Sequence, residues 1–103
     1  MIDVAKACGA DAVKFQLFSG KILYPDDYKM QKLFKKVESN INWVNQLKVH
    51  ASKNRIILFF SSFDEKNLKF LIKKKFYYHK IASSEIVNFK LMKNLNNNKY
   101  KVC

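Results

Sequence analysis

Lysine and glutamine side chains occur where an apolar strand is expected, near the start of the chain. Lys14 and Gln16 lie two residues apart in AVKFQLF (12–18), whose apolar residues are typical of a strand. Because side chains alternate across a strand, Lys14 and Gln16 share one face. An unpaired ammonium group is costly in a dry interior. The segment therefore predicts that a negatively charged group lies close to Lys14.

Two later segments place polar residues in a similar position. Ser61 follows the strand predicted over 55–60, and Lys80 lies on the strand predicted over 76–83, with Ser83 and Glu85 at its end. In parallel α/β folds, functional residues gather at the carboxyl ends of the strands. Lys14 and Lys80, with hydroxyl groups from Ser61 and Ser83, could therefore bind one small dianion such as a phosphate or a carboxylate. The alternative is that protein acids neutralise the lysines, and the acids near these strand ends are Glu85, Asp64 and Glu65.

The elements that must position these residues alternate between helix and strand. Strands are predicted over 10–18, 55–60, 76–83 and, as the start of a fourth, in YKVC (100–103). A first helix is predicted over 1–8 and ends at Gly9, and a second is predicted over 28–37, after a loop at 19–27. A third helix should begin after a cap at Ser39 or Asn40, and a fourth after a cap at Asp64. The last helix is predicted over 86–95, with an apolar face of Ile86, Phe89, Met92 and Leu95. Alternation of this kind indicates an α/β fold with parallel strands.

Composition excludes several classes of protein. The longest apolar run covers only 56–60, so we expect no membrane span, and the first residues lack the pattern of a secretory signal. Cys8 and Cys103 have no ligand-like spacing and indicate reduced thiols in a cytoplasmic protein. The net charge is +12, but Arg55 is the single arginine and the lysines are spread along the chain. We therefore expect the lysine side chains to be exposed to solvent over the surface, and we expect no nucleic-acid partner.

Three segments, in order, resemble the bacterial sialic acid synthase family, whose members make N-acetylneuraminate, legionaminate and pseudaminate. These segments are GADAVKFQ (9–16), FFSSFDEKNLKFL (59–71) and KIASSEIVN (80–88). The resemblance implies a partial (β/α)8 TIM barrel of about three βα units. It also implies condensation of phosphoenolpyruvate with an N-acetylated amino sugar such as N-acetylmannosamine, giving a nine-carbon 2-keto sugar acid and phosphate.

The resemblance assigns roles to particular residues. It implies that Lys14, Ser61, Lys80 and Ser83 bind phosphoenolpyruvate, and that Gln16 and Glu85 hold the amino sugar. It further implies a divalent metal, Mn or Mg, whose histidine ligands lie in a part of the family's barrel that this chain does not match. His50 and His79 do not replace those ligands, and His79 is expected to be packed or partly exposed, on the face opposite Lys80. Ser62 replaces a proline of the family motifs, which predicts a looser turn there. Ser84 replaces a glycine, and if its position requires positive φ, the backbone there should be strained.

Residues 1–103 are therefore interpreted as a portion of the synthase barrel domain. The first strand, the second half of the barrel and the family's C-terminal antifreeze-like domain are expected to be absent. We expect the full-length relatives to be homodimers, and this chain alone to be inactive and to associate or fold only in part. The alternatives are another phosphoenolpyruvate- or phosphate-binding barrel synthase and a non-catalytic, basic nucleic-acid-binding remnant.

Overall fold

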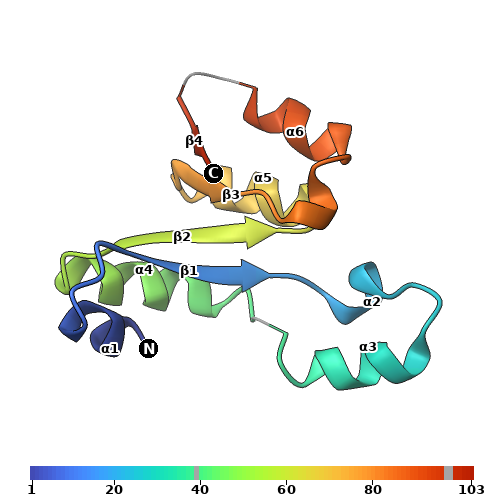
Figure 1. Cartoon of the computed structure of the whole chain (residues 1–103), viewed down its shortest axis with the longest axis horizontal. Helices are drawn as coiled ribbons and strands as arrows, with labels where there is room; N and C mark the ends of the chain where they lie inside the picture. The colour runs from blue at the N-terminus through green and yellow to red at the C-terminus, as the bar shows by residue number, and fades with distance from the viewer. Residues whose placement is uncertain (39, 97–98) are drawn as a thin grey trace.

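A four-stranded parallel sheet forms the centre of the molecule (Figure 1). The structure is a computed structural model that describes residues 1–38, 40–96 and 99–103. The strands lie side by side in chain order and are β1 (Ala12–Leu17), β2 (Ile57–Ser62), β3 (Tyr78–Lys80) and β4 (Lys101–Val102). The predicted parallel α/β fold is confirmed, and one strand separates β1 from β3 as the candidate site requires.

Helices connect the strands, as parallel pairing demands. They are α1 (Ile2–Ala7), α2 (Gly20–Leu23), α3 (Tyr28–Lys35), α4 (Trp43–Lys53), α5 (Glu65–Lys73) and α6 (Phe89–Leu95), with a 3₁₀ turn, η1 (Ser83–Glu85), after β3. None of the helices in the described ranges is long and apolar enough to cross a membrane. The short helix α2 lies inside the segment predicted to be a loop, so that prediction was wrong there. Its Gly20 packs against α3, where a Cβ atom would lie 3.0 Å from the carbonyl oxygen of Gln31.

One face of the sheet holds the core. Phe15 pairs with Phe60 in adjacent strands, and both side chains point toward the helices. The buried cluster on this side consists of Leu17, Val44, Phe60, Leu71 and Phe76. His79 is also on this side, opposite Lys80 as predicted, and is only 1% exposed, so it is the packed alternative that the structure shows. The apolar side chains of α4 and α5 therefore cover this face and leave the other face of β1, β2 and β3 free for polar groups.

Side chains of aspartate and asparagine set the start of three helices. Asp27, Asp64 and Asn88 accept hydrogen bonds from the backbone N–H groups of residues three positions later, at 2.9, 2.7 and 3.2 Å. The predicted cap at Asp64 is confirmed. The predicted cap at Asn40 was wrong, because its side chain accepts from the N–H of Asn42 in a turn just before α4. Ser39, the other predicted cap, lies outside the described residues.

Element boundaries differ from the predicted ones where the backbone changes direction. The second strand begins later and ends later than 55–60, because Arg55 adopts a φ of 51° after α4 and because Ser61 and Ser62 continue the pairing with β1. The third strand is shorter than 76–83, since its pairing with the neighbouring strands begins at Tyr78 and the chain enters η1 soon after Lys80.

The last helix also differs from its prediction. It begins at Phe89, because residues before it form η1 and the Asn88 cap, and its buried residues are Leu91 and Leu95. Phe89 is 81% exposed and Ile86 is 66% exposed, so the predicted apolar face was wrong except for Leu95.

Candidate functional site

A row of polar residues crosses the uncovered face of the sheet. Gln16 pairs with Ser61, and Ser61 pairs with Lys80, so the three side chains project on the same side of β1, β2 and β3. Lys14 lies two residues before Gln16 and shares that face, opposite Phe59. Neighbouring strands are about 4.8 Å apart, so the backbones of Gln16 and Lys80 are separated by roughly 10 Å. Flexible side chains can span that distance and reach one small ligand.

Ser61 is the buried centre of this row. Its side chain is 1% exposed, and its hydroxyl group has no hydrogen-bond partner within the described part of the chain. A buried polar group without a partner costs about 1–3 kcal/mol. Such a group in a folded protein calls for an explanation, and a ligand that supplies the missing hydrogen bond is one.

Lys14 and Lys80 add positive charge on either side of Ser61. The Nζ atom of Lys80 donates to the carbonyl oxygen of Ile81 at 2.9 Å. Within the described ranges, the ion pairs are His50–Asp3 and Lys69–Glu65, so no carboxylate pairs with Lys14 or Lys80. The uncovered face therefore carries two ammonium groups whose charge no described protein acid neutralises.

The acids that could have paired with these lysines have other partners. Asp64 caps α5, and Glu65 accepts from Lys69 at 2.8 Å. Glu85 accepts through Oε2 from the Nδ2 atom of Asn88 at 2.9 Å. Lys14 is exposed, so solvent rather than a dry interior surrounds its ammonium group, and the predicted need for a nearby negative group is not met. No described carboxylate competes with an external anion for Lys14 or Lys80.

Ser83 and Glu85 lie in η1, immediately beyond the carboxyl end of β3. The N–H of Glu85 donates to the carbonyl oxygen of Ala82 at 2.8 Å, which closes the turn. Ser83 is exposed and Glu85 is partly exposed. The structure thus brings Lys14, Gln16, Ser61 and Lys80 onto one face and places Ser83 and Glu85 in the turn next to it.

The two serine substitutions in the family motifs lie in regular backbone, in β2 and in η1. Ser62 is 2% exposed and pairs with Leu17, so it extends β2 where a looser turn was predicted. Ser84 lies within η1 and does not have positive φ, since Arg55 and Lys75 are the non-glycine residues with positive φ in the described part. The backbone at Ser84 therefore carries no left-handed strain.

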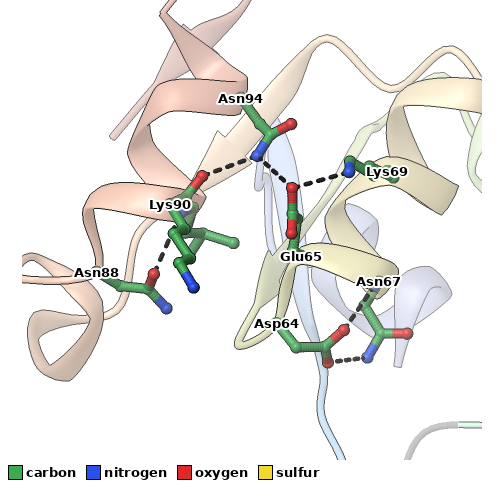
Figure 2. Close-up of polar contacts among 8 residues, drawn as sticks. Asp64, Glu65, Asn67, Lys69, Asn88, Lys90 and Asn94 are labelled. Carbon is green, nitrogen blue, oxygen red and sulfur yellow. Dashed lines mark hydrogen bonds and ion pairs between the residues drawn. The ribbon is translucent and has the colours of Figure 1, made fainter.

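A polar network joins α5 to α6 (Figure 2). The Nδ2 atom of Asn94, on α6, donates to Oε1 of Glu65 at 3.1 Å and to the carbonyl oxygen of Lys90 at 2.7 Å. Glu65 also accepts from Lys69, and this bond, followed by that from Asn94, lowers the pKa of its carboxyl group. Sequence reasoning assigned no role to Asn94 or to Asn88, although an asparagine at the start of an apolar helix is a recognisable cap signal.

Metal ligands are not assembled by these residues. In the described part of the chain, no group of three His, Cys, Asp or Glu side chains could hold a metal ion. His50 pairs with Asp3 at 2.7 Å and links α4 to α1, whereas His79 lies on the helix-covered face and contacts the carbonyl oxygen of Phe76 at 3.0 Å. The residues present do not fit the Mn or Mg that the family resemblance implies.

Comparison with known proteins identifies the family. The model of the NeuB family matches residues 1–103. The chain belongs to the NeuB family. The crystal structure of N-acetylneuraminic acid synthetase from Leptospira borgpetersenii serovar Hardjo-bovis, in complex with citrate, superposes with a TM-score of 0.85 at 32% identity. The match covers 89% of this NeuB-family chain and 32% of the synthetase chain.

A second relative is an uncharacterized protein of Methanocaldococcus jannaschii. It is 30% identical over 92 residues, which are 89% of this chain and 27% of that protein. The chain therefore spans about a third or less of the length of these two relatives. The comparisons confirm the predicted resemblance to the sialic acid synthase family and the partial-barrel fold.

Proposed function

We propose that this chain forms part of the substrate site of a sialic-acid-type synthase. In the proposed reaction, phosphoenolpyruvate condenses with an N-acetylated amino sugar to give a nine-carbon 2-keto sugar acid and phosphate. The observation that carries the proposal is the placement of Lys14 and Lys80 on one uncovered face, without a described protein acid to pair with, on either side of the unpartnered hydroxyl of Ser61. Membership of the NeuB family supports the reaction type.

The proposed roles follow from charge and hydrogen-bonding capacity. Lys14 and Lys80 neutralise the phosphate and carboxylate of phosphoenolpyruvate, and Ser61 and Ser83 donate hydroxyl hydrogen bonds to the same ligand. Gln16 lies in the same row as Ser61 and hydrogen-bonds the amino sugar, as does Glu85 from η1. Each charge-assisted hydrogen bond to the anion contributes about 1.5–3 kcal/mol.

The proposed reaction forms a carbon–carbon bond and a bond from C2 to the oxygen of water, and it breaks the bond from C2 to the phosphate oxygen. The C3 carbon of phosphoenolpyruvate attacks the aldehyde carbon of the sugar, whose oxygen takes up a proton. Water then adds at C2 of the phosphoenolpyruvate unit, the bond from C2 to the phosphate oxygen breaks, and the keto group forms. Of the two protons of that water, one balances the proton on the sugar oxygen and the other leaves with the phosphate. The residues of this chain bind and orient the two substrates and stabilise the negative charge of the phosphate. A closed barrel of this kind takes about 250 residues and this chain has 103, so we expect no release of phosphate by this chain alone.

Titration of the protein with phosphoenolpyruvate tests the proposal. Lys14→Met and Lys80→Met each keep most of the side-chain volume and remove the charge, and each should weaken binding at least tenfold. Lys66→Met, on the exposed surface of α5, is the matched control and should leave the affinity unchanged. Equal losses in all three variants, or no binding by the wild-type protein, would contradict the proposed site.

A further inference from the structure

We infer that Asn88 is a positioning residue that fixes the carboxylate of Glu85 and leaves one of its oxygens free to accept a hydrogen bond from the amino sugar. The inference rests on the proposed function only for the identity of that ligand. The inference is based on two hydrogen bonds of the Asn88 side-chain amide, one that caps α6 and one that contacts Glu85. Its Oδ1 atom accepts from the N–H of Leu91 at 3.2 Å, and its Nδ2 atom donates to Oε2 of Glu85 at 2.9 Å.

The helix cap determines the orientation of the amide. A backbone N–H can bond only to the oxygen end of the amide, so the nitrogen end must point away from Leu91. In the structure that nitrogen end points to Glu85. Figure 2 shows Asn88 at the start of α6 with its oxygen directed toward the first turn of the helix.

Helix α6 is itself firmly placed, which makes Asn88 a fixed anchor. Leu91 is fully buried and packs in a cluster with Leu68 and Leu95. Asn94 also ties α6 to Glu65 on α5. The position of Asn88 is therefore set by contacts that do not involve the candidate site.

A backbone hydrogen bond also links Glu85 to Asn88. The N–H of Asn88 donates to the carbonyl oxygen of Glu85 at 2.9 Å, so main chain and side chain both close the turn over 85–88. A glutamate side chain has three rotatable bonds, and ordering it costs conformational entropy. The bond from Asn88 supplies that ordering before a ligand arrives, which is how a preorganised site gains affinity.

One oxygen of Glu85 remains available. Its Oε2 atom is bonded to Asn88, and its Oε1 atom has no hydrogen-bond partner among the residues that the structure describes. An ionised carboxylate only accepts hydrogen bonds. The group that it recognises must therefore be a donor, such as a sugar hydroxyl or the N–H of an N-acetyl group.

Substitution by serine separates the two roles of Asn88. Serine caps a helix about as well as asparagine, so Asn88→Ser keeps the bond to Leu91 and loses the donor to Glu85. We expect its melting temperature to stay within a few degrees of the wild type. Its affinity for N-acetylmannosamine, measured with phosphoenolpyruvate present, should fall about fivefold, and in a Glu85→Ala background it should not fall further. Asn45→Ser, on the exposed face of α4, is the matched control and should change neither quantity.

A measurement without ligand decides the inference independently. In nuclear magnetic resonance spectra, the side-chain amide protons of Asn88 should exchange slowly with solvent in the wild-type protein and faster in Glu85→Ala. Unchanged exchange in Glu85→Ala would overturn the inference, and so would sugar binding by Asn88→Ser at wild-type affinity. If the wild-type protein binds no N-acetylmannosamine, the proposed sugar site fails, while the exchange measurement still decides whether Asn88 holds Glu85.

Discussion

Ser61 illustrates how a single hydroxyl group can report a binding site. It lies between Gln16 and Lys80 in the row across the sheet, is almost fully buried, and has no hydrogen-bond partner in the described part of the protein. Alternation along the strand predicted that Lys14 and Gln16 share a face, and the expected parallel sheet allowed Lys80 to share it. The burial of Ser61 could not be predicted, because it depends on the register of both neighbouring strands.

Removal of this hydroxyl should separate stability from binding. Ser61→Ala should leave the free energy of unfolding unchanged or raise it by about 1 kcal/mol, because an unsatisfied buried polar group is lost. Its affinity for phosphoenolpyruvate should fall about tenfold, which corresponds to 1.4 kcal/mol. Chemical denaturation and ligand titration measure the two effects, with Ser84→Ala in the exposed turn as the control. A large loss of stability in Ser61→Ala would indicate a structural role instead.

His79 should make stability depend on pH. Its ring is buried, and this burial lowers the pKa below the usual value of 6.5, although the bond to the carbonyl oxygen of Phe76 partly opposes the shift. The unfolded state therefore binds a proton more readily than the folded state. The free energy of unfolding should be highest above pH 6.5 and should decrease as the pH falls from there through the lowered folded-state pKa. Denaturant titrations between pH 5 and 8 check this, and His79→Gln should flatten the dependence; a rise in stability toward pH 5 would contradict it.

At the scale of elements, local signals predicted which segments form helices and strands better than where they end. Asp64 and the apolar residues after it were enough to predict α5, because the cap and the buried leucines are local features. The start of α6 was missed because the chain forms the η1 turn before Asn88, which moved the buried face to Leu91 and Leu95. The extension of β2 through Ser61 and Ser62 depends on pairing with β1, which a single segment does not reveal.

The Asp64 cap should contribute measurably to the stability of α5. Asp64 accepts from both the backbone N–H and the side-chain Nδ2 of Asn67, at 2.7 and 2.6 Å. Loss of a cap of this kind costs about 1 kcal/mol. Asp64→Ala should lower the free energy of unfolding by about that amount in urea denaturation. Asp26→Ala, which removes an exposed aspartate that caps no helix in the described part, should have little effect; equal losses in the two variants would refute the capping role.

The whole molecule has an apolar patch on its surface. The patch consists of Phe89, Met92 and Val102, which line one surface cavity together with Leu95 and the polar residues Lys93 and Asn96. β1 and β4 are the edge strands of the sheet in the described chain (Figure 1). Exposed apolar groups and open edges promote association. The open sheet edges and unsealed apolar face of an incomplete barrel led us to expect this behaviour, but the residues of the patch could not be predicted while the helix face was assigned incorrectly.

Association should therefore depend on the apolar patch. Sedimentation velocity at increasing protein concentration should show growth in the average mass of the wild-type protein. Phe89→Glu should reduce that growth, whereas Tyr28→Glu, which replaces an equally exposed aromatic residue on α3, should not. A wild-type protein that stays monomeric at all concentrations would contradict this prediction.

The convergence of Lys14 and Lys80 on one anion is tested most directly by a crystal structure of the protein with phosphoenolpyruvate. We predict that both Nζ atoms lie about 2.8 Å from oxygen atoms of a single ligand molecule on the uncovered face of the sheet, with the hydroxyl of Ser61 bonded to the same molecule. Ligand bound elsewhere, or bound with only one of the two lysines in contact, would contradict the proposed site.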